Sequence, residues 1–321
     1  MRKHIIIIYG PTGVGKSDYA INLAQDIPLE IINGDVGQLY TPLSIGTAKP
    51  DWKKEKAPHH LFDIISEPHD FTVVQFRKRV LEICEQVWLR GATPVVVGGS
   101  GFYLKSLFFP PLPDCYNKQM VKEVDSFKEF STSDLYIQLQ TLSPERACQI
   151  HPHDRYRIER ALLLARDNPL MVHKLRPSYQ ELGFAYLFIH FSRERTDLYN
   201  RINRRVNQML KGGWIEEVQA LQNTPWQEFL QRKKLIGYDD ILSFLHSNQG
   251  LKDLENQIAQ KTRHYAKRQM TFWRMLEKEL TVHCVAPSAI EKFLITDETK
   301  TYESVHNTVT TFLASLQGKN I

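Results

Sequence analysis

The chain has 321 residues, of which 42% are hydrophobic and 24% are charged, and these proportions are typical of a globular protein. Its length favours one large domain together with a smaller one. No apolar run approaches the roughly 20 residues that a membrane-spanning helix needs. The first residues also lack the cleavage-site pattern of a signal peptide, so we expect the protein to stay in the cytosol. We also expect a monomer without a membrane partner.

The cysteine spacing bears on disulfides and metal sites, and the charge distribution bears on the kind of binding partner. The four cysteines are scattered and form no C-x-x-C pair, so they indicate neither a disulfide framework nor a zinc site. The net charge is +5, yet residues 193–275 alone carry a larger surplus of Lys and Arg over Asp and Glu. Such a segment suits a polyanionic partner, although many basic helices are only solvated faces.

The N-terminal third alternates short apolar runs with amphipathic segments. The runs His4–Tyr9, Leu29–Ile32 and Pro94–Val97 predict buried strands. Apolar residues at three-to-four spacing predict helices over Lys16–Gln25 and Val73–Leu89. Strands that alternate with helices predict parallel βαβ units and a doubly wound α/β sheet.

The pattern changes after Leu107. Phe108–Pro113 contains three prolines and predicts a linker, and Tyr116–Ser178 shows helical segments without a convincing strand. The apolar run Phe184–Phe191 is again strand-like. The C-terminal part predicts long helices over Leu198–Leu221 and Leu254–Leu276 and a last strand over Thr281–Val285.

We therefore predict an α/β fold. Its parallel-sheet core carries the phosphate-binding motif G-x-x-x-x-G-K-[ST] of a P-loop after the first strand, and this P-loop parallel-sheet core holds an inserted, mainly helical domain. The predicted parts are the first part of the core over residues 1–111, the insertion over 112–180, and the return to the core over 181–321.

The strongest motif is a phosphate-binding loop. It follows the first predicted strand, opens the first predicted helix and fits G-x-x-x-x-G-K-[ST]; its residues are Gly10, Pro11, Thr12, Gly13, Val14, Gly15, Lys16 and Ser17. Backbone N–H groups and a helix N-terminus converge there on phosphate oxygens. Lys16 adds a point charge, and the Ser17 hydroxyl can bind Mg²⁺. The motif indicates a diphosphate or a triphosphate without choosing between them.

Two further loops follow predicted strands. Asp35 lies just beyond Leu29–Ile32, at the end of a strand where open α/β sheets place their sites. It could be a magnesium-linked carboxylate, a general base or a turn cap. The glycine-rich loop that contains Ser100 follows Pro94–Val97, and taken alone it is more often a flexible turn than a ligand loop.

At this point the sequence resembles the tRNA dimethylallyltransferases, also called tRNA isopentenyltransferases. The resemblance runs in order along nearly the whole chain, in the blocks GPTGVGKS, GDVGQLY, IGTAKP, APHHLFDI, VVVGGSGFYLKSL, HPHDRYRIERAL, RINRRVNQML, LIGYDDI and TRHYAKRQMTFWR. It implies transfer of a dimethylallyl group from dimethylallyl diphosphate to the exocyclic amine of the adenosine 3′ of the tRNA anticodon, with Mg²⁺ as cofactor.

The resemblance also implies residue roles. Asp35 would take the proton from the amine, Ser100 would contact the bridging oxygen of the donor, and Arg205 would hold the diphosphate. The stretch Asp35, Val36, Gly37 and Gln38 would bind the tRNA, with Gln38 at an edge of the adenine. Because the base must leave its stack to reach the site, base flipping is expected.

Further tRNA contacts are expected from two helical segments. The first holds Tyr156, Arg157, Ile158, Glu159 and Arg160, and its arginines could instead form a salt-bridged surface with neighbouring acids. The second is basic and aromatic. Its cations Lys267 and Arg268 are expected to face phosphate, whereas its aromatic residues are expected to lie in the core.

The sequence departs from the family pattern at several positions. Asn33 and Val36 stand where serine is usual, Ser100 replaces threonine, and Leu163 replaces glutamate. The usual T-G-K-P block reads Asp167-Asn168-Pro169-Leu170. Asp35 and Gln38 are retained, so we expect activity, with different hydrogen bonding around the base.

Two other functions are compatible with the residues alone. A P-loop kinase for a nucleoside or small molecule would use the insertion as a lid and turn over ATP without tRNA. A non-catalytic RNA-binding protein with a relic P-loop would bind RNA whether or not Asp35 is present.

Overall fold

The computed structural model describes residues 2–111, 127–167, 177–286 and 288–317. They form two compact units, of which one comprises Met1–Leu107 with Glu181–Ile321 and the other Phe108–Gln180. Each unit has its own hydrophobic core. The end of the predicted linker, residues 112 and 113, and Cys115 lie outside the described residues.

The larger unit is built on a six-stranded parallel sheet with the strand order β3-β2-β4-β1-β5-β6. The strands are β1 (His4–Tyr9), β2 (Leu29–Asn33), β3 (His59–His60), β4 (Thr93–Gly98), β5 (Ala185–Ser192) and β6 (Ala289–Leu294). The central strands β1, β2 and β4 are buried along their whole length. This sheet, together with its surrounding helices, confirms the predicted α/β P-loop core.

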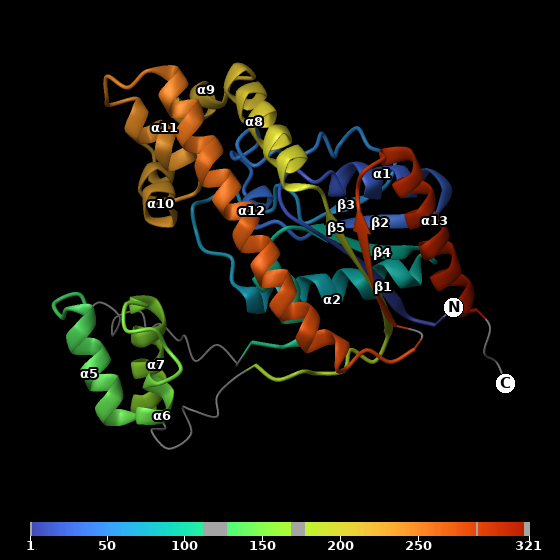
Figure 1. Cartoon of the computed structure of the whole chain (residues 1–321), viewed down its shortest axis with the longest axis horizontal. Helices are drawn as coiled ribbons and strands as arrows, with labels where there is room; N and C mark the ends of the chain where they lie inside the picture. The colour runs from blue at the N-terminus through green and yellow to red at the C-terminus, as the bar shows by residue number, and fades with distance from the viewer. Residues whose placement is uncertain (1, 112–126, 168–176, 287, 318–321) are drawn as a thin grey trace. The chain divides into compact units, whose positions relative to one another are not determined.

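Helices cover both faces of the sheet (Figure 1). On β1, Ile6 and Ile8 belong to a core cluster with residues of α1 (Lys16–Asp26) and α13 (Glu298–Ser315). Because successive strand residues point to opposite faces, Tyr9 faces the other side, where its ring lies 5.6 Å from that of Trp273 on α12 (Leu251–Thr281). The P-loop at the end of β1 therefore lies between two packed layers.

The other helices of the larger unit follow in chain order. They are the 3-10 helix η1 (Val36–Leu39), α2 (Val73–Leu89), α3 (Gly101–Phe108), α8 (Arg195–Lys211), α9 (Trp214–Gln219), α10 (Pro225–Lys233), α11 (Tyr238–Phe244) and α12 (Leu251–Thr281). A capping box formed by Thr72 and Gln75 begins α2. Among the described residues, none of these helices has the length and apolar character needed to cross a membrane.

Two predicted elements were wrong. The single helix over Leu198–Leu221 is divided into α8 and α9, because Gly213 has φ 97°, a left-handed conformation that interrupts the helix. The last strand is not Thr281–Val285, since α12 continues to Thr281 and β6 follows later. The predicted helix over Leu254–Leu276 is present as part of the 31-residue α12.

The smaller unit contains α5 (Thr132–Leu142), α6 (Pro144–Ala147) and α7 (Arg155–Asp167), and its described residues include no strand. Its core forms where α5 packs on α7, with Leu135, Leu139 and Ile158 fully buried. Of the altered T-G-K-P block, residues 168–170 lie outside the described residues.

Candidate active site

The P-loop joins β1 to α1, and two of its glycines adopt backbone angles that other residues rarely adopt. Gly13 and Gly15 have φ 83° and 103°, a left-handed region that favours glycine. Lys16 donates hydrogen bonds to the carbonyl oxygens of Gly10 at 3.0 Å and Pro11 at 3.1 Å. Burial lowers the pKa of Lys16 to about 8, and Asp35 opposes the shift. Ser17 is exposed in the first turn of α1.

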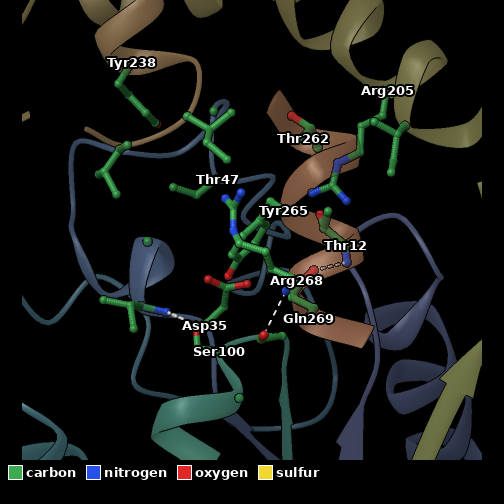
Figure 2. Close-up of a pocket in the computed structure, with 18 of the residues that line it drawn as sticks. Thr12, Asp35, Thr47, Ser100, Arg205, Tyr238, Thr262, Tyr265, Arg268 and Gln269 are labelled. Atoms are coloured by element: carbon green, nitrogen blue, oxygen red, sulfur yellow. Dashed lines mark hydrogen bonds between the residues drawn. The ribbon is translucent and has the colours of Figure 1, made fainter. Parts of the chain in front are cut away.

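Asp35 is held in a tight turn after β2. The buried Asn33 accepts a hydrogen bond from the Asp35 N–H at 2.8 Å and donates to the carbonyl oxygens of Asp35 and Leu61. Asparagine thus fixes this turn where serine was expected. The half-buried Asp35 lines a cavity of about 560 Å³ (Figure 2).

The Ser100 loop lies against the Asp35 turn. The N–H of Val36 donates to Ser100 Oγ at 3.3 Å. A Cβ on Gly98 would lie 2.2 Å from the carbonyl oxygen of Gly34, so the close approach of these two loops requires glycine. Gly98, the last residue of β4, is therefore a packing position, and Ser100 lines the same cavity as Asp35.

Helix α8 brings arginines to the P-loop. Arg205 lines the large cavity and also a second cavity of about 320 Å³ beside Gly13 and Gly15. Burial lowers the pKa of Arg205, while Asp35 opposes this shift. Arg201 donates to the carbonyl oxygen of Gly13 at 3.0 Å. The spacing along the helix predicts that Arg204 points elsewhere, but it lines the second cavity together with Arg201 and Arg205.

Three segments that are far apart in the sequence meet at the apolar wall of the cavity. The buried Trp214 is wedged so closely that a Cβ on Gly46 or on Gly237 would lie 2.1 Å or 2.0 Å from its ring. Glu217 accepts hydrogen bonds from the N–H groups of Ser44, Ile45 and Gly46, and also from the Tyr238 hydroxyl. The blocks IGTAKP and LIGYDDI thus meet at this wall.

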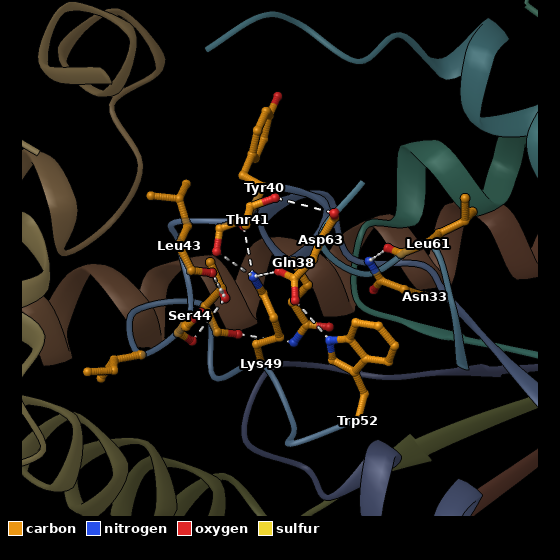
Figure 3. A network of polar contacts seen from close by, with 12 residues as sticks. Asn33, Gln38, Tyr40, Thr41, Leu43, Ser44, Lys49, Trp52, Leu61 and Asp63 are labelled. Carbon is orange, nitrogen blue, oxygen red and sulfur yellow. Dashed lines mark hydrogen bonds and ion pairs between the residues drawn. The ribbon is translucent and has the colours of Figure 1, made fainter. Parts of the chain in front are cut away.

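Gln38 belongs to a polar network behind the wall. Its Nε2 donates to the carbonyl oxygens of Thr47 at 3.1 Å and Ala48 at 3.3 Å. Nearby, the buried Lys49 pairs with Asp63, which also accepts from Trp52 at 3.0 Å (Figure 3). Val36 and Gly37 line the cavity, whereas Gln38 does not. Contact between Gln38 and an adenine stays a prediction.

Helix α12 supplies side chains that the sequence reasoning did not assign to the site, namely Thr262, Tyr265, Gln269 and Phe272. Trp273 is in the core as expected, stacked 4.4 Å from the His190 ring, but Tyr265 and Phe272 line the cavity instead. Burial raises the pKa of Tyr265, and the charge of Asp35 raises it further. The phenol therefore stays neutral. One sequence feature could have assigned this helix to the site: Gln269 is a polar residue on the buried stripe of an amphipathic helix.

The expected RNA-facing residues differ in exposure. On α12, Lys267 and Arg268 are exposed, and Arg268 also lines the cavity. On α7 of the smaller unit, Tyr156 is 64% exposed, whereas Ile158 is fully buried and packs in the core of that unit.

The acids and arginines of α7 are partly engaged in ion pairs. Arg155 pairs with Glu159 at 2.7 Å and donates to the carbonyl oxygens of Phe127 and Phe130, so it has a structural role. Arg157 is exposed and pairs with Asp154 at 3.2 Å.

The chain is similar to proteins of one family along most of its length. A model described as IPP transferase matches residues 38–276, and one described as Isopentenyl transferase matches residues 3–61. The tRNA dimethylallyltransferase of Geobacter sulfurreducens is 34% identical over 84% of this chain and 88% of its own.

Solved structures have the same fold. The tRNA isopentenylpyrophosphate transferase of Bacillus halodurans aligns with a TM-score of 0.66 and 28% identity, over 98% of this chain and 97% of its own. A eukaryotic dimethylallyltransferase acting on tRNA aligns with a TM-score of 0.76 and 24% identity, over 96% of this chain and 80% of its own. With a family model over more than half of its residues and a relative matched along most of its length, the chain belongs to the IPP transferase family.

Proposed function

We propose that this protein transfers a dimethylallyl group from dimethylallyl diphosphate to the exocyclic amine (N6) of the adenosine on the 3′ side of the tRNA anticodon, with release of diphosphate. One observation carries the proposal. Thr12 of the P-loop and Arg205 line the same cavity as the carboxylate of Asp35 and the hydroxyl of Ser100. The transfer needs both a cationic site for diphosphate and a nearby proton acceptor. The name of the Geobacter relative supports the same reaction.

The first step concerns the leaving group. The allylic carbon–oxygen bond breaks, and the bonding electron pair leaves with the diphosphate, so negative charge grows there while the dimethylallyl group becomes cationic. Lys16 and Arg205 stabilise that charge most strongly in the transition state. The Ser100 hydroxyl donates to the bridging oxygen.

A magnesium ion would be held at the P-loop, where Ser17 lies in the first turn of α1. Among the described residues, no group of three His, Cys, Asp or Glu gathers to form an all-protein metal site. Mg²⁺ keeps several waters and is held largely by substrate phosphates, so it needs few protein ligands. The exposed Ser17 hydroxyl would supply the protein ligand. When bound, the ion neutralises part of the diphosphate charge.

The second step concerns the acceptor. The N6 nitrogen attacks the allylic carbon and forms the new nitrogen–carbon bond, and the amine loses one proton to Asp35. An adenine amine is a weak nucleophile, so its placement beside the donor matters as much as the base. The adenine must unstack to reach the cavity. Exposed Lys267 and Arg268, together with the α7 face of the smaller unit, then contact the anticodon stem-loop.

The lowered pKa of Lys16 predicts a pH dependence for donor binding. Its pKa is lowered to about 8 by burial, so raising the pH through that value removes the positive charge that faces the diphosphate. We expect the affinity of the wild type for Mg²⁺-diphosphate, relative to that of Lys16→Met, to fall between pH 7 and pH 9. Calorimetry on both proteins measures the ratio, since titration of the diphosphate itself affects both equally. A ratio independent of pH would contradict the prediction.

The α7 arginines are predicted to act in tRNA binding and not in the chemistry. Replacing Arg157 and Arg160 with alanine should weaken tRNA binding and reduce its salt dependence, because fewer counterions are released. The single-turnover rate at saturating tRNA should change less than about twofold, since neither side chain touches the reacting atoms. Binding titrations between 50 and 200 mM salt test the prediction. An unchanged salt slope would identify these arginines as structural.

The proposed reaction is tested with labelled dimethylallyl diphosphate, unmodified tRNA and Mg²⁺. We expect label to enter tRNA, and ATP to remain intact in a parallel incubation. Hydrolysis of ATP without transfer of label would instead favour a kinase or an ATPase.

A further inference from the structure

Gln269 is a polar side chain buried between the two halves of the candidate active site. It lies on α12 and is only 4% exposed, yet it lines the large cavity. A buried amide costs free energy unless its donor and acceptor are both satisfied. The partners of this amide therefore show what holds the surrounding loops in place.

Both ends of the Gln269 amide bind backbone groups of different loops. Oε1 accepts a hydrogen bond from the N–H of Thr12 in the P-loop at 2.8 Å. Nε2 donates to the carbonyl oxygen of Gly99, next to Ser100, at 2.8 Å (Figure 2). One rigid amide thus links the loop after β1 to the loop after β4.

The surrounding structure keeps this amide in place. The hydroxyl of the fully buried Tyr9 donates to the backbone carbonyl oxygen of Gln269 at 2.7 Å, which ties α12 to the end of β1. A Cβ on Gly99 would lie 2.4 Å from Gln269 Nε2, so only glycine leaves room for the contact.

We propose that Gln269 is a positioning residue, which holds the phosphate-binding loop and the Ser100 loop at a fixed separation. The proposal deepens the proposed function and rests on it, since one loop would bind the diphosphate and the other would meet its bridging oxygen. Ser100 is in turn bonded to the Asp35 turn through Val36. Gln269 thereby sets the distance between the donor and the proton acceptor. In this arrangement Gln269 contacts neither the breaking carbon–oxygen bond of the donor nor the adenine amine. It therefore acts on the reaction only by positioning the two loops.

Gln269→Met is the first test, because methionine keeps the length and nearly the volume of the side chain but loses both hydrogen bonds. Since misplacement of about 1 Å can cost about 10²-fold in rate, we expect the single-turnover transfer rate at saturating substrates to fall at least about tenfold. Calorimetry should also show weaker binding of Mg²⁺-diphosphate, by about fivefold or more, because the P-loop has lost an anchor. The affinity for tRNA should stay within about twofold.

Gln257→Met is the matched control. Gln257 lies twelve residues earlier on α12, is half-buried, and donates to Asp240 at 2.7 Å, but it does not line the cavity. A general loss of α12 stability would affect both variants alike. The proposal predicts that only Gln269→Met changes the transfer rate and the diphosphate affinity, measured well below each variant's Tm.

Gly99→Ala tests the same bond from the other side, since the added methyl displaces the amide without altering α12. If both substitutions act by breaking one contact, the double variant should be no slower than the slower single variant. If the double variant instead lost transfer rate by the full product of the two single-variant losses, the proposal would be overturned. So would normal diphosphate affinity in both single variants, a result that counts even if the wild type transfers no dimethylallyl group. Absence of transfer by the wild type would by itself reject the proposed reaction.

Discussion

Asp35→Asn should slow the transfer of the dimethylallyl group by about 10²–10⁴-fold, the range typical of a lost general base. The asparagine keeps the shape of the side chain and leaves the Asn33 contacts to the turn intact. It cannot take the proton that the adenine amine must lose. The single-turnover rate at saturating tRNA and donor measures this directly, and tRNA affinity should change little.

The control for Asp35 is Asp18→Asn. Asp18 is exposed on α1 and, like Asp35, it opposes the lowering of the Arg205 pKa. The variant therefore removes a carboxylate that acts on Arg205 and lines the second cavity beside the P-loop, but that does not line the large cavity. We expect its rate to fall less than about tenfold, since it loses no proton acceptor. Near-normal rates for Asp35→Asn would exclude Asp35 as the base.

Arg205→Lys should lower turnover by about 10²-fold, comparable to the loss of one donor that stabilises a developing anion. The planar guanidinium can hold two phosphate oxygens at once, which an ammonium cannot reproduce. Because the charge on the diphosphate grows as the allylic bond breaks, the loss should appear in kcat more than in the KM for the donor. Steady-state kinetics with varied donor separates the two.

The control for Arg205 is Arg195→Lys. Arg204 is unsuitable because it lines the second cavity beside the P-loop. Arg195 begins the same helix, is exposed, and packs its guanidinium 5.2 Å from the Tyr199 ring. Its replacement should therefore leave kcat and the KM for the donor nearly unchanged. If Arg205→Lys raised only KM and kept kcat, the arginine would bind ground state and transition state equally.

The sequence predicts those parts of the site that depend on local pattern. The P-loop and Asp35 follow buried apolar strands, and the carboxyl ends of parallel strands meet at one edge of a sheet. The residues that join these loops are not predictable in this way. Gln269 is 257 positions from Thr12 and 170 from Gly99, and only the packing of α12 brings them together.

The fold errors have a related cause. β6 contains exposed residues such as Glu291 and Lys292 because it is an edge strand, so its apolar pattern is weak. Thr281–Val285 is richer in β-branched residues, but the amphipathic pattern of α12 continues into Thr281. At α8 the helical pattern continues beyond Lys211, and the conformation of Gly213 decides where the helix ends.

Mass spectrometry of the tRNA nucleosides after incubation with the protein, Mg²⁺ and dimethylallyl diphosphate tests the central claim most directly. The adenosine adjacent to the anticodon on its 3′ side should gain the mass of one five-carbon prenyl group at N6, and the Asp35→Asn variant should produce almost none in the same time. An unmodified adenosine at that position, or a prenyl group on another base, would contradict the proposed function.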